Sequence, residues 1–420
     1  MSAALPRKLL SLRRQVGRSW LYITIPAVGG LTPLLALPAV SHAAGTNGWG
    51  AVAVGQSTGL AAYTVVLLGW GLSGPQTVAP LPESAATGVL ALSFVTRAQA
   101  WLLLSLIIGP IAAIVSPHYP LVAALTAAGT AATGLSCSWW FVGRGQPLTI
   151  LFTETIVELL GVLIAAGLLL ARASLLVYPL VGCLIPALVA AALGLWRAGA
   201  LRGIWRVRQP QVASALRSQA AALAGVGVSG IFQALLVTFV AIASPAALPT
   251  YAACERMLRM GLGVLVAVPN AMQRWVGRSE SEAIRTRRVL TAIRYMALIG
   301  LAAGTFFALT APPLADLLFD GKVHIPELTA VLAGAAIALM ATALATGSVA
   351  LVAAREFHTI TRAALAGALV GIPTVMLGAH YLGSKGAYGG ELLAEVAILA
   401  VQGLKLREHF GPTRSSTISA

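Results

Sequence analysis

Twelve apolar stretches of roughly membrane-spanning length run along this 420-residue chain, and they constrain its fold more than any other feature. A helix needs about 20 mainly apolar residues to cross the hydrocarbon core of a bilayer. Hydrophobic residues make up 58% of the chain and charged residues only 10%, whereas soluble domains are about 25% charged. The sequence therefore predicts an all-α integral membrane protein with about 12 transmembrane helices. We place these helices at 20–40, 49–72, 98–117, 121–142, 148–170, 174–195, 218–243, 250–272, 295–318, 327–352, 363–382 and 387–404.

The positions of the 28 Lys and Arg residues predict how the helices cross the membrane. Alternate gaps between the stretches, together with the two ends of the chain, hold 23 of them, and the other gaps hold only Arg172, Lys322 and Lys385. Basic residues accumulate on the cytoplasmic side of membrane proteins. Both termini are therefore expected in the cytoplasm. The remaining two residues, Arg256 and Arg259, fall inside an apolar stretch.

The largest polar gap follows the sixth stretch and divides the helices into two sets of six. This arrangement is typical of transporters built from two pseudo-symmetric lobes around a central cavity. The predicted division is a basic cytoplasmic segment at 1–19, a six-helix lobe at 20–196, a basic cytoplasmic linker at 197–217, a six-helix lobe at 218–404 and a cytoplasmic tail at 405–420.

The net charge of +15 raises the question of nucleic acid as a partner. The basic residues lie in short loops, where they set orientation and meet anionic headgroups, and no base-stacking aromatic pattern accompanies them. Membrane lipids are therefore the expected partner, and nucleic acid is not. The three cysteines are odd in number and form no CxxC pair, so neither a disulfide framework nor a metal site is expected. No other cofactor is expected.

The two arginines inside a predicted helix are the first candidates for binding an anionic substrate. An arginine at mid-membrane costs at least ~2.5 kcal/mol by insertion scales and usually faces the protein interior. Arg256 and Arg259 are three residues apart and share a helix face, and Glu255 is placed to pair with Arg259. A guanidinium group can bind phosphate oxygens through two hydrogen bonds. The alternative is that this helix begins later, so that both arginines lie in the outer headgroup layer.

Other charged residues near the predicted helices have two interpretations each. Arg97 and Arg144 lie at predicted cytoplasmic helix ends, where they either receive an anionic group from the cytoplasm or act as ordinary inside-loop charges. Carboxylates four residues apart on one helix face are candidates for coupling transport to protons or Na+, or are helix-end groups with local arginine partners. These carboxylate pairs are Glu154 with Glu158, and Glu391 with Glu395.

Several short motifs, in their order along the predicted helices, resemble the polysaccharide-unit flippases of the multidrug/oligosaccharidyl-lipid/polysaccharide (MOP) exporter superfamily. The resemblance covers about residues 20–405. In that family helix four ends in a Trp-aromatic-Phe-x-Gly pattern and helix twelve starts with a Gly-x-x-Gly turn. Many members carry an acidic residue in helix seven, where this chain has only Gln233. The motifs are GTNGWG (45–50), GWGL (69–72), SWWFVGRGQ (138–146), LPTYAA (248–253), ER (255–256), VP (268–269), LLFDGK (317–322) and GSKGAYGG (383–390).

The resemblance implies transport of a lipid-linked oligosaccharide by alternating access. The substrate would be an oligosaccharide on undecaprenyl pyrophosphate, flipped across the bacterial inner membrane for surface polysaccharide assembly, with other assembly proteins as partners. A bacterial source also agrees with the excess of 24 Arg over 4 Lys. The family motif places Arg144 beside Trp139, Trp140 and Phe141. These aromatic residues either stack on sugar rings or anchor the helix at the membrane interface.

Two other functions stay open. An exporter of drugs or of another lipid-linked substrate in the same superfamily would suit an amphipathic cation in an acidic cavity, whereas Arg256 and Arg259 favour an anionic substrate. A non-transporting membrane scaffold of a polysaccharide assembly complex is the second alternative. An enzyme is not expected, and no catalytic residues are assigned, because the chain has no acidic DxxD cluster and its predicted outer loops are very short.

Overall fold

The computed structural model describes residues 32–410 apart from 266, 278–280 and 355, and these residues form helices without any strand. The predicted segment 1–19 and most of the predicted helix 20–40 lie outside the described residues. Seven helical segments of the described chain are long and apolar enough to span a membrane. Large apolar side chains such as Ile114 and Leu309 are 83% and 73% exposed, as expected of surfaces that face lipid. The chain is a multi-pass membrane protein.

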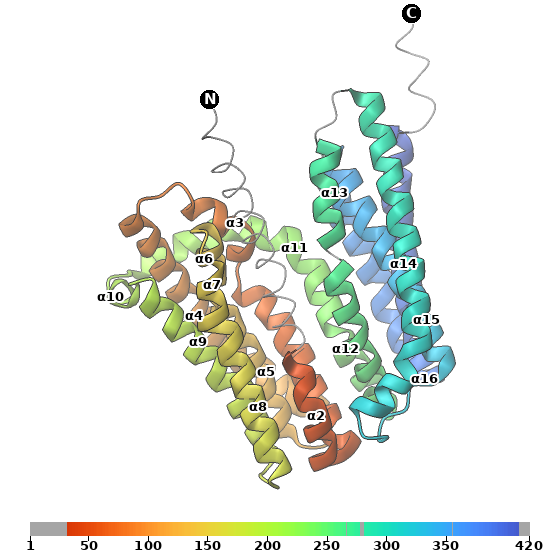
Figure 1. Cartoon of the computed structure of the whole chain (residues 1–420), viewed down its shortest axis with the longest axis horizontal. Helices are drawn as coiled ribbons and strands as arrows, with labels where there is room; N and C mark the ends of the chain where they lie inside the picture. The colour runs from red at the N-terminus through yellow and green to blue at the C-terminus, as the bar shows by residue number, and fades with distance from the viewer. Residues whose placement is uncertain (1–31, 266, 278–280, 355, 411–420) are drawn as a thin grey trace, which may run out of the picture.

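Two helical bundles stand side by side (Figure 1). Helix α11 packs against α2 of the first bundle and α16 of the second, and so joins them. The first bundle contains η1 (Thr32–Ala36), α2 (Leu37–Val66), α3 (Trp70–Val78), α4 (Glu83–Val115), α5 (Pro120–Ala132), η2 (Thr133–Leu135), α6 (Ser138–Gly143), α7 (Pro147–Ile150), η3 (Leu151–Thr155), α8 (Ile156–Leu170), η4 (Tyr178–Leu184), α9 (Ile185–Arg197) and α10 (Leu201–Ile204). The second contains α11 (Gln209–Ala243), α12 (Leu248–Leu265), α13 (Ala267–Gly277), α14 (Glu282–Leu318), α15 (Glu327–Leu344), η5 (Ala345–Leu351) and α16 (Phe357–Phe410).

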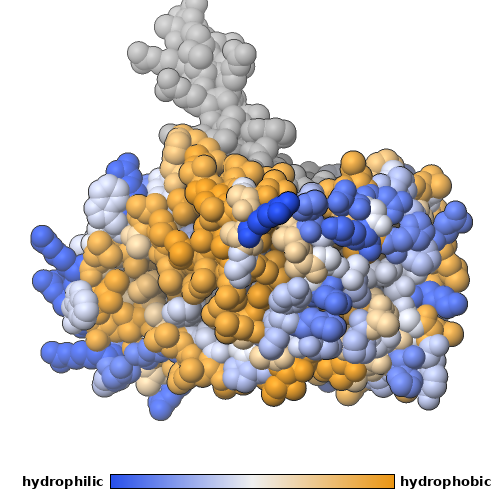
Figure 2. Space-filling view, turned by 90° about the horizontal axis from the view of Figure 1, so that it is seen from below, coloured by the Kyte–Doolittle hydropathy of each residue, from blue (hydrophilic) through white to orange (hydrophobic). Residues whose placement is uncertain are grey.

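The two ends of the molecule differ. We call one the hairpin end: it carries the bends at Gly45 and Gly383 and the turns at 116–119 and 319–326, and the bundles meet there (Figure 1, bottom). The opposite, basic end carries the connections at 67–69, 144–146 and 198–208, and the bundles diverge toward it. Seen from below, hydrophobic residues reach the outline of the molecule on most sides (Figure 2). The charge pattern predicts that the basic end faces the cytoplasm.

Two predicted pairs of helices are joined by a single glycine instead of a loop. Helix α2 bends at Gly45 (φ 62°, ψ −158°), and α16 bends at Gly383 (φ 65°, ψ −145°). This backbone region is accessible essentially to glycine alone. Both bends begin a Gly-Thr/Ser-x-Gly sequence. The two halves of the chain therefore use the same glycine-dependent bend at the hairpin end.

Replacing Gly383 with alanine is expected to destabilise the second bundle by about 1–3 kcal/mol, because a side chain is strained in this backbone conformation. The measurement is thermal unfolding of the purified protein in detergent. Gly403→Ala is the matched control, since Gly403 lies in the same helix with open space where its Cβ would be. Equal unfolding temperatures for the two variants would contradict the assignment of strain to Gly383.

Three predicted helix starts were wrong. The helix predicted at 98–117 begins at Glu83, and the helices predicted at 218 and 295 begin at Gln209 and Glu282. Much of the predicted loop between the second and third helices is therefore helical, and the predicted linker 197–217 contains α10 and the first turns of α11. Hydropathy marks where the hydrocarbon layer ends, whereas a helix continues as long as its backbone hydrogen bonds do.

Candidate functional site

A cavity of about 340 Å³ lies between the two bundles, with walls formed by α2, α11 and α12. Its apolar lining includes Trp49, Leu60 and Val237. A second cavity of about 170 Å³ lies in the first bundle. Gln56, Leu60 and Arg256 line both cavities, so the two spaces meet at these side chains. This junction at membrane depth is the candidate site.

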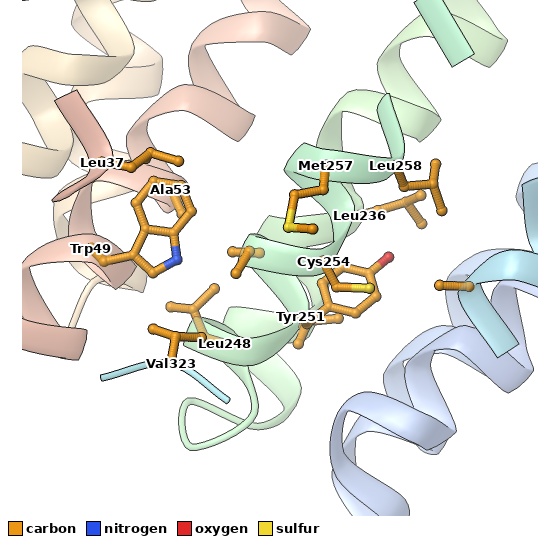
Figure 3. Close-up of a cluster of buried hydrophobic side chains, with 14 of the residues drawn as sticks. Leu37, Trp49, Ala53, Leu236, Leu248, Tyr251, Cys254, Met257, Leu258 and Val323 are labelled. Atoms are coloured by element: carbon orange, nitrogen blue, oxygen red, sulfur yellow. The ribbon is translucent and has the colours of Figure 1, made fainter. Parts of the chain in front are cut away.

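Aromatic and apolar contacts between the bundles close the hairpin end. The indole N–H of Trp49 donates to the carbonyl oxygen of Pro249 at 3.2 Å. The Trp49 ring lies 5.2 Å from the ring of Phe319. Figure 3 shows Leu248 and Val323 across from the same indole. Since the bundles diverge in the other direction, this conformation is closed at the hairpin end.

Lys322 adds a polar clasp to this closure. Its ammonium group donates to the carbonyl oxygens of Ser41 and His42, at 2.9 and 3.4 Å. The His42 ring also lies 3.7 Å from the carboxylate of Asp320. These carbonyls belong to the last turn before the bend at Gly45, where backbone acceptors lack helical partners and the helix dipole is negative. Lys322 is one of the three basic residues in the gaps that the charge pattern predicts to lie outside. Its contacts across the bundles account for a lysine at this position.

The prediction that Arg256 and Arg259 lie inside a helix is confirmed, since α12 begins at Leu248. Arg259 is held by partners on three helices. Its Nε lies 2.5 Å from the Glu255 carboxylate, and its Nη1 donates to the side-chain oxygen of Gln233 at 2.9 Å. Its Nη2 lies 3.7 Å from the carboxylate of Glu391. The predicted pairing with Glu255 is confirmed, and the charge of Arg259 is balanced within the second bundle.

Two tyrosines and a third carboxylate complete this cluster around Arg259. The hydroxyl of Tyr251 donates to Glu391 at 3.3 Å, and that of Tyr388 donates to Glu255 at 3.5 Å. Glu395 is 4% exposed, one turn beyond Glu391, and makes no hydrogen bond to the described residues. The cluster therefore contains three buried carboxylates and one arginine.

Arg256 has a different environment, although it follows Glu255 directly. Among the residues that the structure describes, no carboxylate lies within ion-pair distance of its guanidinium group. Its buried Nε has no hydrogen-bond partner there. Its side chain lines both the central cavity and the second cavity. Arg256 is thus an uncompensated cation at the junction of the two spaces.

Arg97 and Glu154 hold a break in the fourth predicted helix, between η2 and α6. Arg97 donates through Nη1 to the carbonyl oxygens of Gly134 and Ser136, at 2.8 and 2.7 Å. Glu154 accepts from the Ser136 hydroxyl at 2.6 Å and from the backbone N–H of Cys137 at 3.0 Å. The cation thus meets the carbonyl end of one helix and the carboxylate meets the amide end of the next, as helix dipoles favour. The pair satisfies backbone groups that lipid cannot.

The expected position of Arg97 at a helix end was wrong. Arg97 lies within α4, is fully buried and does not line the central cavity. Arg97 is buried because its side chain holds the break between η2 and α6, and hydropathy does not reveal that break. Arg144 follows α6, as expected, and donates to the carbonyl oxygen of Leu81 at 2.9 Å. It ties α6 to the connection between α3 and α4, away from the residues that line the central cavity.

The three aromatic residues of the fourth predicted helix are buried inside the first bundle. Trp139, Trp140 and Phe141 are at most 4% exposed. Trp139 packs against Trp70 at 5.3 Å between ring centroids, and Trp140 donates its indole N–H to the carbonyl oxygen of Ala86 at 3.0 Å. This placement differs from both roles expected of them, because a buried ring meets neither a sugar nor the membrane interface.

Sequence reasoning did not select Gln56 or Tyr178, which line the second cavity, or Lys322 as a clasp. Two signals were present: Gln56 is a polar residue inside a predicted span, and Lys322 departs from the charge pattern. Over the described part of the chain, no group of three His, Cys, Asp or Glu residues is arranged to hold a metal ion.

The sequence matches no protein-family model and no curated protein. An inward-facing multidrug-resistance MATE transporter of the MOP superfamily is 13% identical, with a TM-score of 0.62 over 94% of this chain and 95% of that one. The lipid II flippase MurJ, in an inward closed conformation, is 12% identical, with a TM-score of 0.63 over 93% and 87%. This chain shares the fold of these two solved structures. The eukaryotic MATE transporter AtDTX14 is also similar, at 15% identity and a TM-score of 0.55 over 96% and 99%.

These similarities define the fold and leave the substrate open. The MOP fold is shared by multidrug transporters and by a lipid flippase, so it does not choose between the two substrate classes expected from the sequence. Identities of 12–15% are too low to transfer a substrate or a site residue. The choice depends on the chemistry of this chain's own cavity.

Proposed function

We propose that the protein flips undecaprenyl-pyrophosphate-linked oligosaccharide units across the bacterial inner membrane by alternating access, for surface polysaccharide assembly. The supporting observation is Arg256, which lines the cavity between the bundles without an acidic partner among the described residues. A buried cation without a partner is costly, and a diphosphate with its several oxygens is a suitable counter-ion. The apolar walls formed by Trp49, Leu60 and Val237 suit the polyprenyl chain of the same substrate.

Export of amphipathic cations is the second candidate, and one observation favours it. Glu255 lines the central cavity, and Glu391 and Glu395 are buried close behind it. When all three carboxylates are ionised they exceed the single charge of Arg259, and the second bundle then offers a negative site. This acidic cluster and Arg256 favour opposite substrates. A scaffold role in a polysaccharide assembly complex would require neither group to bind a ligand.

We also propose that the cluster around Arg259 couples transport to a gradient of protons or Na+. When all three carboxylates are ionised, the cluster holds two uncompensated negative charges at membrane depth. Such burial is unfavourable unless protons or cations bind. The other predicted pair is less suited, because the carboxylate of Glu154 already accepts two hydrogen bonds at the break.

Replacing Arg256 with glutamine is expected to weaken binding of undecaprenyl pyrophosphate in nanodiscs by roughly 10- to 100-fold, the loss of a charge-assisted hydrogen bond. Surface polysaccharide should fall accordingly in cells that depend on this protein. Arg256→Lys should restore part of the binding because it keeps the charge. Arg202→Gln, which removes an exposed arginine of α10, is the control and should bind normally.

The same assay separates the two candidate functions. Wild-type binding of undecaprenyl pyrophosphate, lost in Arg256→Gln, supports the flippase. No binding of this lipid by the wild type, together with tight binding of a cationic dye that is lost in Glu255→Gln, would overturn it in favour of the exporter. Equal levels of folded protein for all variants, checked by size-exclusion chromatography, are required for the comparison.

A further inference from the structure

Most of the residues that line the second cavity are polar. Seven helical segments contribute side chains with hydroxyl, amide or carboxylate groups or a guanidinium group. The amide nitrogen of Gln56 donates to the hydroxyl of Tyr178 at 2.8 Å, which fixes both groups on one wall. The polar lining consists of Thr32, Gln56, Thr130, Thr133, Glu158, Tyr178, Cys183 and Arg256.

Glu158 is the group that needs an explanation. It lies near the middle of the apolar span Pro147–Leu170 and is half-buried at the cavity wall. Its carboxylate makes no hydrogen bond or ion pair with another described residue, whereas Glu154, one turn earlier, has two hydrogen bonds. An ionisable side chain at this depth without a protein partner points to a ligand. Arg256, on the same cavity, also has an unpartnered nitrogen.

We propose that the second cavity binds the sugar attached directly to the diphosphate, with Glu158 accepting hydrogen bonds from its hydroxyl groups. This inference rests on the proposed function. The sugar and the lipid are attached to opposite ends of the diphosphate. If the diphosphate binds Arg256, the first sugar and the lipid therefore extend from Arg256 in different directions. The central cavity has the larger apolar lining beside its own polar groups, and the second cavity supplies donors and acceptors that a sugar requires. Glu158 is therefore assigned as a residue that determines sugar specificity.

A sugar hydroxyl can donate and accept hydrogen bonds, and the site contains partners for both. An ionised carboxylate accepts only, so Glu158 selects donors such as sugar O–H groups. The threonine hydroxyls and the tyrosine hydroxyl can donate or accept. A site that hydrogen-bonds a substrate hydroxyl discriminates strongly against ligands without one, because its buried groups are then left unpaired. Bare undecaprenyl pyrophosphate should therefore bind more weakly than the sugar-bearing lipid.

The test compares two probes on the full-length protein in nanodiscs. One is undecaprenyl pyrophosphate without sugar, and the other is the pool of lipid-linked saccharides extracted from the strain that encodes the protein. Native mass spectrometry reports the amount of each bound lipid. The wild type should prefer the sugar-bearing lipids by about 10-fold or more, and Glu158→Gln should reduce this preference to about 3-fold or less, as expected when a charge-assisted hydrogen bond is weakened. Its binding of the bare lipid should stay unchanged.

The controls separate this inference from the proposed function. Glu327→Gln removes an exposed carboxylate at the start of α15 and should keep the full preference. If Glu158→Gln does not fold, Thr130→Val on the same cavity tests the site in its place. Normal binding of the bare lipid with an undiminished preference in Glu158→Gln overturns the sugar site alone. Failure of the wild type to bind either probe overturns the proposed function.

Discussion

Replacing Arg97 with glutamine is expected to destabilise the first bundle by roughly 2–5 kcal/mol. Two backbone carbonyls at the break, those of Gly134 and Ser136, lose their charged donor, and the carboxylate of Glu154 loses a nearby positive charge. Leaving buried polar groups and a buried charge without compensation has costs of this size. The measurement is the temperature at which the purified protein loses its monodisperse peak in detergent. A decrease of several degrees or failure to accumulate in the membrane is the expected result.

Arg144→Gln is the matched control for this variant. Arg144 lies in the same bundle, directly after α6, but is partly exposed and has one backbone partner, Leu81. Its loss should cost about 1 kcal/mol, typical of a single hydrogen bond. Similar stability of Arg97→Gln and Arg144→Gln would show that the break is held by packing alone. The break would then need another explanation.

Replacing Lys322 with methionine is expected to open the hairpin end. The variant loses two charge-assisted hydrogen bonds between the bundles, to Ser41 and His42. Loss of about 1.5–3 kcal/mol from the closed state raises the population of open molecules roughly 10-fold or more, if the open state does not use this contact. The native Cys183 reports the change, because it is partly exposed in the second cavity while Cys137 and Cys254 are buried. Its labelling by a membrane-impermeant maleimide added to intact cells should increase several-fold.

Lys385→Met is the control for the clasp. Lys385 is another exposed basic residue near the hairpin end, and in the described structure it contacts no group across the bundles through a hydrogen bond or ion pair. Labelling of Cys183 should stay at the wild-type level in this variant. An unchanged rate in Lys322→Met would contradict the clasp whatever the substrate proves to be. A Cys183→Ser background confirms which thiol is labelled.

Hydropathy predicted the all-helical membrane fold, for a physical reason. Lipid requires long apolar helices, so each span leaves a signal in the local sequence. Local spacing also predicted the pairing of Glu255 with Arg259, because residues four apart on a helix are neighbours. The same signals located helix starts poorly, as the start of α4 at Glu83 shows. Helical hydrogen bonding continues beyond the hydrocarbon layer, where composition is no longer informative.

The site was only partly predictable, because its decisive contacts join distant parts of the chain. In the sequence, only the spacing from Glu255 distinguishes Arg259 from Arg256, whereas in the structure Glu391 and Gln233 also reach Arg259 alone. Both partners lie on other helices, Gln233 on α11 and Glu391 on α16. Likewise, no feature of the neighbouring sequence indicates that the carboxylate of Glu154 accepts hydrogen bonds while that of Glu158 does not. Tertiary packing decides which charge is balanced and which is left for a ligand.

The contacts of Arg97 and Glu154 at the break between η2 and α6 also have a consequence for biosynthesis. Arg97 is synthesised 37 residues before Gly134, whose carbonyl it binds. At about 5–20 residues per second, this delay lasts roughly 2–7 s. During that time α4 carries an unpaired guanidinium group, which costs at least ~2.5 kcal/mol in hydrocarbon. We therefore expect stable insertion of α4 to depend on chain that has not yet left the ribosome, and the helices from α4 to α8 to enter the membrane as one cooperative unit.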